Sequence, residues 1–118
     1  MSLQFFDWEI EGITVLHLTG RLTLGDGTAV LRKLIQDTLA SGKKKIVLDM
    51  SEVYYVDSSG LGELVAAHTT VSRQDGMLAL SRLTQRVQDL VQLTKVYRIF
   101  DVFDTEQAAV QSLAAKSH

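Results

Sequence analysis

The most constraining feature of this sequence is a short apolar run that leads into two serines and then into a helical pattern. The run Ile-Val-Leu at 46–48 is expected of a buried strand. After several polar residues comes Asp-Ser-Ser-Gly at 57–60. From Leu61 onward, apolar residues recur at helical spacing. The stretch 46–62 therefore predicts a strand followed by a helix whose first turn carries both serines.

A helix start favours small polar residues for reasons unrelated to function. Its first N–H groups lack intrahelical partners and carry partial positive charge, so Asp57, Ser58 and Ser59 suit a capping role. Gly60 and Gly62 cost about 1 kcal/mol each in a helix, and they would let the backbone of another protein approach closely. From these residues alone, a simple cap and an exposed serine open to a modifying enzyme are both consistent interpretations.

The size and composition of the chain limit the class of protein. With 118 residues and 13.1 kDa, we expect one domain spanning 1–118. Hydrophobic residues at 46% and charged residues at 22% are ordinary for a soluble globular chain. No apolar run approaches the ~20 residues of a membrane span, and the first residues do not resemble a signal peptide. We therefore expect a cytoplasmic protein without membrane insertion.

The chain also lacks the residue types of several kinds of site. It has no cysteine, which excludes a disulfide framework and a thiolate zinc site. Its three histidines, at 17, 68 and 118, are too scattered to indicate a metal site. The net charge is −2 and the only basic cluster is Lys43–Lys45, so there is no basic face for nucleic acid. We expect neither a metal, a cofactor nor a nucleic-acid partner.

Hydrophobic periodicity assigns the remaining elements. A strand, a helix and a further strand in succession indicate a right-handed parallel crossover, so we expect an α/β fold with a mixed sheet that is antiparallel only at the opening hairpin. The last residues, Ala114 to His118, are expected to be frayed. The predicted elements are strands at 4–10 and 13–19, a loop at 20–27, a helix from Thr28 to about Ser41 capped by Asp26 or Thr28, a strand at 45–50, a helix ending near Arg73, a strand at 77–80, a helix capped by Thr84, a strand or extended segment at 96–102, and a helix capped by Asp104 or Thr105.

One segment carries a resemblance to a known family. The sequence D-S-S-G-L-G at 57–62, following V-L-D-M-S-E-V at 47–53, resembles the STAS domain, and in particular the bacterial anti-sigma factor antagonists. Weaker matches lie at 18–22, 76–80 and 103–108. The resemblance implies a single STAS-like domain with a mixed four- to five-stranded sheet and about four helices packed mainly on one side.

The resemblance also implies a function. In the antagonists the first serine after the aspartate is phosphorylated, and it aligns with Ser58. The partner would be an anti-sigma factor with serine kinase activity, and a PP2C-type phosphatase would reverse the modification. The protein itself would not be an enzyme. Many antagonists have an aspartate where this chain has Thr23. The residues expected to contact the partner are Asp57, Ser59, Gly60, Leu61, Gly62 and Thr23.

Other classes of function make different demands on the sequence. A serine hydrolase would need G-x-S-x-G, whereas Val56 and Asp57 precede Ser58, and His68 is expected to pack on the apolar face of its helix. A STAS subunit of a stressosome-like scaffold or of a lipid-transport ATPase complex is the main alternative, and a small-ligand sensor is a third.

Strand alternation predicts that one of Tyr54 and Tyr55 faces the core.

Overall fold

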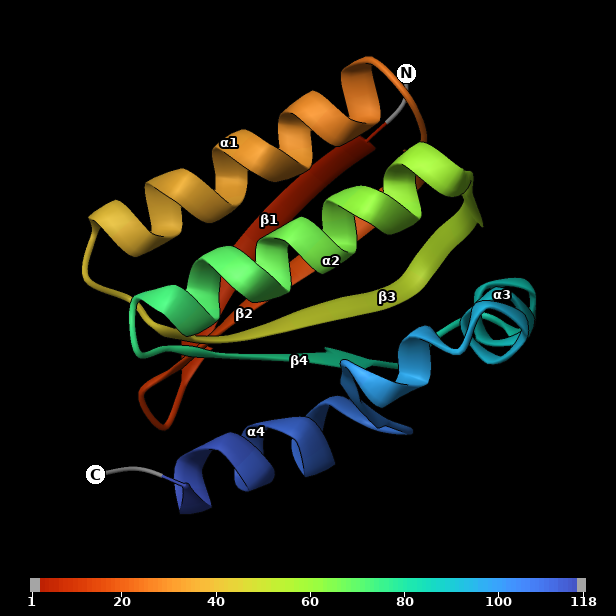
Figure 1. The fold of residues 1–118 in the computed structure, drawn as a ribbon. Coiled ribbons are helices and arrows are strands. Elements are labelled where there is room, and N and C mark those ends of the chain that lie inside the picture. Colours follow the sequence, from red (N-terminus) through yellow and green to blue (C-terminus); the bar gives the residue numbers. More distant parts are fainter. Residues whose placement is uncertain (1–2, 117–118) are drawn as a thin grey trace.

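The structure is a computed structural model that describes residues 3–116, and it has a five-stranded sheet with helices on both faces (Figure 1). The strands lie in the sheet in chain order. This arrangement confirms the predicted α/β class with a mixed sheet and four α-helices. The elements are β1 (Leu3–Ile10), β2 (Ile13–Leu22), α1 (Asp26–Ala40), β3 (Lys45–Val56), α2 (Ser58–Arg73), β4 (Met77–Ser81), α3 (Gln85–Thr94), the 3-10 turn η1 (Val96–Arg98), β5 (Asp101–Phe103) and α4 (Glu106–Ala115).

The strand pairing explains where α1 and α2 lie. β1 and β2 pair antiparallel through a tight turn at Glu11 and Gly12, which both have positive φ. The pairs β2–β3, β3–β4 and β4–β5 are parallel, and each connection advances by one strand in the same direction. Right-handed crossovers that advance in one direction place their helices on one face. Accordingly, α1 and α2 lie side by side over the same face of the sheet (Figure 1).

The other face of the sheet is covered by α4, whereas α1, α2 and α3 pack on the core cluster of the first face, so the helices lie mainly on one side, as predicted. Ala109, Val110 and Leu113 of α4 pack with Val47 and Ala79 in a core cluster separate from the one beneath α1, α2 and α3. Successive strand residues point to opposite faces, so a strand buried on both faces has a continuous apolar run. Because α4 covers this second face, β3 is buried on both faces, which explains its apolar run at 46–48.

The strands that lead to the serines are longer than predicted. β3 continues to Val56 and β2 continues to Leu22, because the two strands go on pairing beyond register shifts in β2. The loop predicted at 20–27 is thereby shortened to three residues. α1 begins at Asp26 and not at Thr28. Its N-cap is Gly25, at φ 97°, so neither predicted side-chain cap of this helix is present.

The caps predicted for the last two α-helices are confirmed. The Thr84 hydroxyl accepts a hydrogen bond from the Val87 N–H at 3.4 Å, and the Thr105 hydroxyl accepts one from the Ala108 N–H at 3.0 Å. Each bond satisfies one of the N–H groups that a helix start leaves without a backbone partner. The cap positions were therefore readable from local chemistry.

The C-terminal third differs from the prediction in two places. The segment 96–102 is not one strand, because η1 and a turn at Ile99 precede the three-residue β5. Ala114 and Ala115, expected to be frayed, belong to α4, while Ser117 and His118 lie outside the described residues. Within residues 3–116, none of the helices combines the length and the hydrophobicity that crossing a membrane requires.

Candidate functional site

The centre of the candidate site is the first turn of α2. Asp57 is its N-cap, with extended backbone, and its Oδ1 accepts the Gly60 N–H at 2.7 Å. Its carbonyl oxygen accepts the Leu61 N–H at 2.9 Å, which starts the helical hydrogen-bond series. Ser58 is consequently the first helical residue, and its side chain is exposed. The structure thus assigns the cap to Asp57 and leaves Ser58 exposed to solvent.

The second carboxylate oxygen of Asp57 holds the loop that follows β2. Oδ2 accepts the Leu24 N–H at 3.0 Å, and the Asp57 N–H donates to the Leu22 carbonyl at 3.3 Å. The N–H groups of Leu24 and Gly60 hold the pKa of Asp57 below its ordinary value, because both stabilise the carboxylate. The loop containing Thr23 therefore lies against the start of α2, as expected from the resemblance.

The predicted contact residues divide by exposure. Gly62 is exposed beside Ser58, and Thr23, Asp57 and Ser59 are partly exposed. Leu24, which the sequence did not single out, is 75% exposed, and its backbone is bonded to Asp57. The exposed apolar side chain of Leu24 therefore belongs to the loop that is bonded to the start of α2. These residues form what we call the serine surface: Thr23, Leu24, Asp57, Ser58, Ser59 and Gly62.

Two of the predicted contact residues face the protein interior. A Cβ atom added to Gly60 would lie 2.0 Å from the carbonyl oxygen of Leu22, so no side chain fits there. Leu61 is 8% exposed and belongs to the core. The expectation that Gly60 leaves room for another protein is wrong: that room is occupied by the end of β2. Gly62, with no atoms close to its missing side chain, is open.

An ion pair between the first two helices lies close to the site, and sequence reasoning missed it. Nη2 of Arg32 in α1 lies 2.7 Å from Oε1 of Glu63 in α2. The Glu63 side chain is 10% exposed, whereas that of Arg32 is 60% exposed. No local pattern relates two residues that are 31 positions apart. The pair fixes α2 relative to α1 and neutralises the carboxylate closest in sequence to the exposed Gly62.

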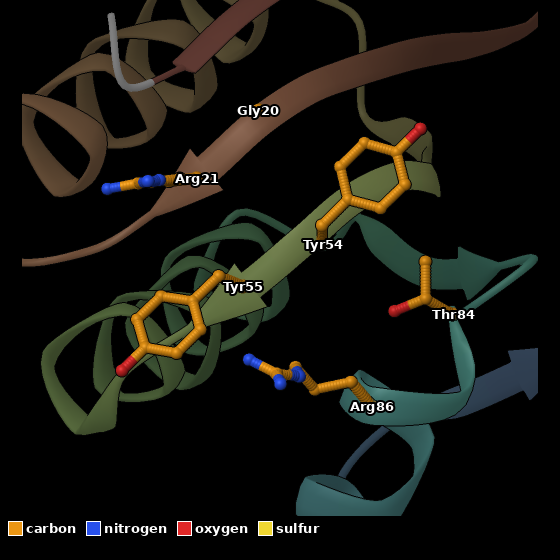
Figure 2. Close-up of a pocket in the computed structure, with 6 residues that line it drawn as sticks. All are labelled: Gly20, Arg21, Tyr54, Tyr55, Thr84 and Arg86. Carbon is orange, nitrogen blue, oxygen red and sulfur yellow. The ribbon is translucent and has the colours of Figure 1, made fainter.

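The two tyrosines before the site are both on the surface. Tyr54 is 62% exposed and Tyr55 is 45% exposed, so the prediction that one of them faces the core is wrong. Val53 and Val56 on either side of them are buried. Figure 2 shows both rings projecting from the end of β3. Strand alternation fails here because the pairing of β3 with β2 is irregular near its end.

The two histidines within residues 3–116, His17 and His68, contact residues other than the serines of the site. Nε2 of His17 lies 3.2 Å from Oε1 of Glu52, and the ring of His68 meets Phe100 edge-on at 5.4 Å. Within residues 3–116, no histidine is therefore positioned to activate Ser58 as a nucleophile. In the same range no cluster of three or more acidic or histidine side chains is arranged to hold a metal ion. His118 lies outside the described residues.

Comparison with known proteins agrees with the fold and the motif. The family model for the STAS domain matches residues 8–109. The anti-sigma-F factor antagonist RsfB of Mycobacterium tuberculosis is 30% identical over 92 residues, which are 76% of this chain and 75% of RsfB. The crystal structure of Thermotoga maritima TM1081 is 26% identical, covers 92% of this chain and 93% of its own, and has a TM-score of 0.85.

A second solved structure shows the same fold at lower identity. It is the Bacillus cell fate determinant SpoIIAA in its phosphorylated form, with 18% identity, a TM-score of 0.69, and coverage of 92% of this chain and 98% of SpoIIAA. The STAS match covers most of the chain, including both the serine-bearing turn and the loop after β2. This chain therefore belongs to the STAS domain family.

Proposed function

We propose that this protein is an anti-sigma factor antagonist in a bacterial signalling pathway. Its unphosphorylated form binds an anti-sigma factor that is also a serine kinase, and this binding releases a sigma factor. Phosphorylation of Ser58 ends the binding, and a PP2C-type phosphatase restores it. The protein acts by binding in the cytoplasm and is not an enzyme; ATP and Mg²⁺ belong to the kinase.

The observation that carries this proposal is the exposure of Ser58, the first residue of α2. Because Asp57 already caps the helix, Ser58 is not needed for that role. A kinase needs a hydroxyl that it can reach, and Ser58 is more exposed than Ser59. The names of the relatives support the class of partner, since RsfB and its like are called antagonists of anti-sigma factors.

The serine surface supplies the proposed contact with the kinase. Leu24 and Thr23 present an apolar and a polar side chain on one side of Ser58, and Gly62 gives close access on the other. Gly60 and Leu61 contribute indirectly, because they hold the start of α2 against Leu22. Thr23 replaces the acidic residue of many antagonists, so this side of the surface carries less negative charge.

The physical basis of the proposed switch is desolvation. A phosphoserine adds a charge of about −1.5 to −2 at neutral pH. A partner that fits closely over Ser58 and Gly62 would have to remove water from that charge, and burying an unpaired charge is very unfavourable. The carboxylate of Asp57, adjacent in sequence and held in its ionised form by two N–H groups, adds to the negative potential there. Phosphorylation therefore favours dissociation.

The experiment that tests the proposal combines the purified chain, the candidate kinase and Mg-ATP. We expect intact-mass and fragment spectra to place one phosphate on Ser58. The Ser58→Ala variant should bind the kinase and accept no phosphate, and Ser58→Asp should bind more weakly. Ser59→Ala is the matched control for the phosphorylated position and should still accept one phosphate on Ser58. Phosphate on Ser59 alone would contradict the assignment. In a pull-down from the native host, recovery of transporter ATPases instead of sigma-factor regulators would favour the alternative assembly.

A further inference from the structure

A wide groove lies beside the serine surface, between the ends of β2 and β3 and the start of α3 (Figure 2). Its volume is about 890 Å³, and the residues that line it are Gly20, Arg21, Tyr54, Tyr55, Thr84 and Arg86. The Thr84 hydroxyl is engaged in capping α3 and in a bond to the Val53 carbonyl. The groups available to a ligand are therefore two guanidinium groups and two phenol rings.

The two arginines of the groove carry uncompensated charge. Both are exposed, and within residues 3–116 neither forms an ion pair, whereas Arg32 and Arg82 are paired with Glu63 and Asp49. No carboxylate is among the residues that line the groove. The whole chain has a net charge of −2, so this positive region is local and runs against the overall charge. Such a region attracts anionic groups.

The side chain of Arg86 is held in place by an aromatic ring. Its guanidinium carbon lies 5.6 Å from the ring centroid of Tyr55, a cation–π distance, and Figure 2 shows the side chain directed toward that ring. This contact leaves the N–H groups at the guanidinium edge free. A guanidinium edge binds a carboxylate through two parallel hydrogen bonds. Arg86 is therefore pre-positioned for a carboxylate.

A second groove continues the first along α3. It has a volume of about 310 Å³ and shares Tyr55 and Arg86 with the first groove. Most of its other side chains are apolar: Val56, Val87, Leu90 and Leu93, with Asp89 as the acidic exception. Leu93 is 82% exposed. The combined surface, which we call the tyrosine groove, thus has a basic end near Arg21 and an apolar end near Leu93.

We propose that the tyrosine groove binds an acidic segment of the protein partner, with carboxylates on Arg21 and Arg86 and an apolar side chain between Tyr55 and Leu93. Small ligands are usually enclosed by their pockets. Tyr54 is 62% exposed to solvent and Tyr55 is 45% exposed, and the two grooves adjoin, so an extended chain of mixed acidic and apolar residues fits better. The proposal rests on the proposed function, because Val56 at the groove directly precedes Asp57 and the same partner would reach both surfaces.

The first test uses the anti-sigma factor kinase and two charge-matched double variants. Arg21→Glu with Arg86→Glu reverses the charge of the groove, and Arg73→Glu with Arg98→Glu makes the same net change at exposed arginines elsewhere. We expect the groove variant to bind at least about tenfold more weakly and the control to bind within about twofold of the natural chain. The KM for phosphorylation of Ser58 should rise while kcat is unchanged, since the groove residues do not include the reacting serine.

The second test does not need the kinase and separates the two proposals. The ¹⁵N-labelled chain is titrated with a short peptide of alternating glutamate and leucine, and with the same peptide carrying lysine for glutamate. We expect the acidic peptide alone to shift the backbone amides of Tyr55 and Arg86. If those amides shift while the kinase does not bind the natural chain, the proposed function fails and the groove remains a site for acidic peptide.

Two kinds of result would contradict the proposal that the groove binds an acidic segment. Kinase binding that is strong and unchanged in the groove variant, together with no shifts from the acidic peptide, would exclude the proposal. Shifts produced by ATP or by phosphatidylglycerol vesicles, and absent with the peptide, would assign the groove to a small anion or a membrane surface instead. Far-UV circular dichroism of each variant verifies that a weaker signal does not come from unfolding.

Discussion

At the scale of single residues, Asp57 joins two segments with one carboxylate. One oxygen caps α2 through Gly60, and the other holds the β2–α1 loop through Leu24. Both bonds are charge-assisted and therefore stronger than bonds between neutral groups. The position of Ser58 relative to Thr23 and Leu24 consequently depends on Asp57 being ionised.

The first prediction is a pH dependence of stability that originates at Asp57. Its pKa in the folded chain is lowered, so its contribution is present above the ordinary pKa of aspartate, about 3.9, and is lost as the pH falls through the lower folded pKa. Asp57→Asn should therefore melt at a lower temperature at pH 7, and its difference from the natural chain should shrink below about pH 4. A difference that is constant from pH 7 to pH 3 would contradict this account. Thermal melts monitored by circular dichroism provide the measurement.

The second prediction concerns the two glycines of the first turn, which form a matched pair. Gly60→Ala places a Cβ against the Leu22 carbonyl and should destabilise the fold by about 1–3 kcal/mol, as overpacking does. Gly62→Ala points into open space within a helix and should stabilise by about 0.5–1 kcal/mol. Urea unfolding of both variants measures the difference. Equal effects of the two substitutions would show that the start of α2 does not approach β2 as described.

At the scale of elements, α4 packs on the sheet by its apolar face, and its first residue, Glu106, interacts electrostatically with a buried carboxylate of β3. Asp49 of β3 is fully buried, accepts the Ser51 N–H at 3.1 Å and pairs with Arg82 at 2.8 Å. Burial acts to raise the pKa of Asp49, but hydrogen bonds from Glu106, Arg82 and Ser51 outweigh it and hold that pKa below its ordinary value. Burial and the contact with Asp49 raise the pKa of Glu106, the first residue of α4.

The third prediction follows from the raised pKa of Glu106. Its stabilising, protonated form is complete below the ordinary pKa of glutamate, about 4.3, and is lost as the pH rises through the higher folded pKa. Glu106→Gln stays neutral and should stabilise the chain at pH 8 by up to about 1 kcal/mol, since a partly exposed group is screened. The gain should vanish near pH 4. Asp104→Asn, at an exposed acid two residues earlier in the chain, is the control and should show no such trend.

At the scale of the whole molecule, the proposed switch acts between proteins and not within the fold. A phosphate on Ser58 would meet the positive end of the α2 dipole, a gain of roughly 0.3–1 kcal/mol at an exposed site. Asp57 opposes part of that gain, whereas Glu63 is already paired with Arg32 and opposes little. The balance for the isolated chain is small, because the phosphate remains in water.

The fourth prediction is therefore a contrast between stability and affinity. The phosphorylated chain should melt within about 5 °C of the unphosphorylated chain, which corresponds to about 1 kcal/mol or less. Its affinity for the kinase should fall at least about tenfold, a loss of roughly 1.4 kcal/mol. Melting curves, far-UV circular dichroism and calorimetric titration measure the three quantities. A large spectral change or a collapse of the melt would instead indicate a conformational switch.

The local features of this protein were determined by its sequence alone. Hydrophobic spacing assigned the strands, helices and crossovers, and hydrogen-bonding chemistry located the caps at Thr84 and Thr105, because both depend on residues within one or two turns. The motif at 57–62 identified the family for the same reason, since it is one continuous segment. The same motif also predicted that Ser58 lies in the first turn of a helix.

Only the tertiary structure decided features that depend on residues far apart in the chain. Gly60 faces inward because β2 extends to Leu22, and both tyrosines face outward because the end of that pairing is irregular. The covering of the second face of the sheet by α4, and the presence of Arg21 and Arg86 in the lining of one groove, likewise arise from packing between separate elements. Periodicity specifies which side chains share a face, but only packing specifies what covers that face.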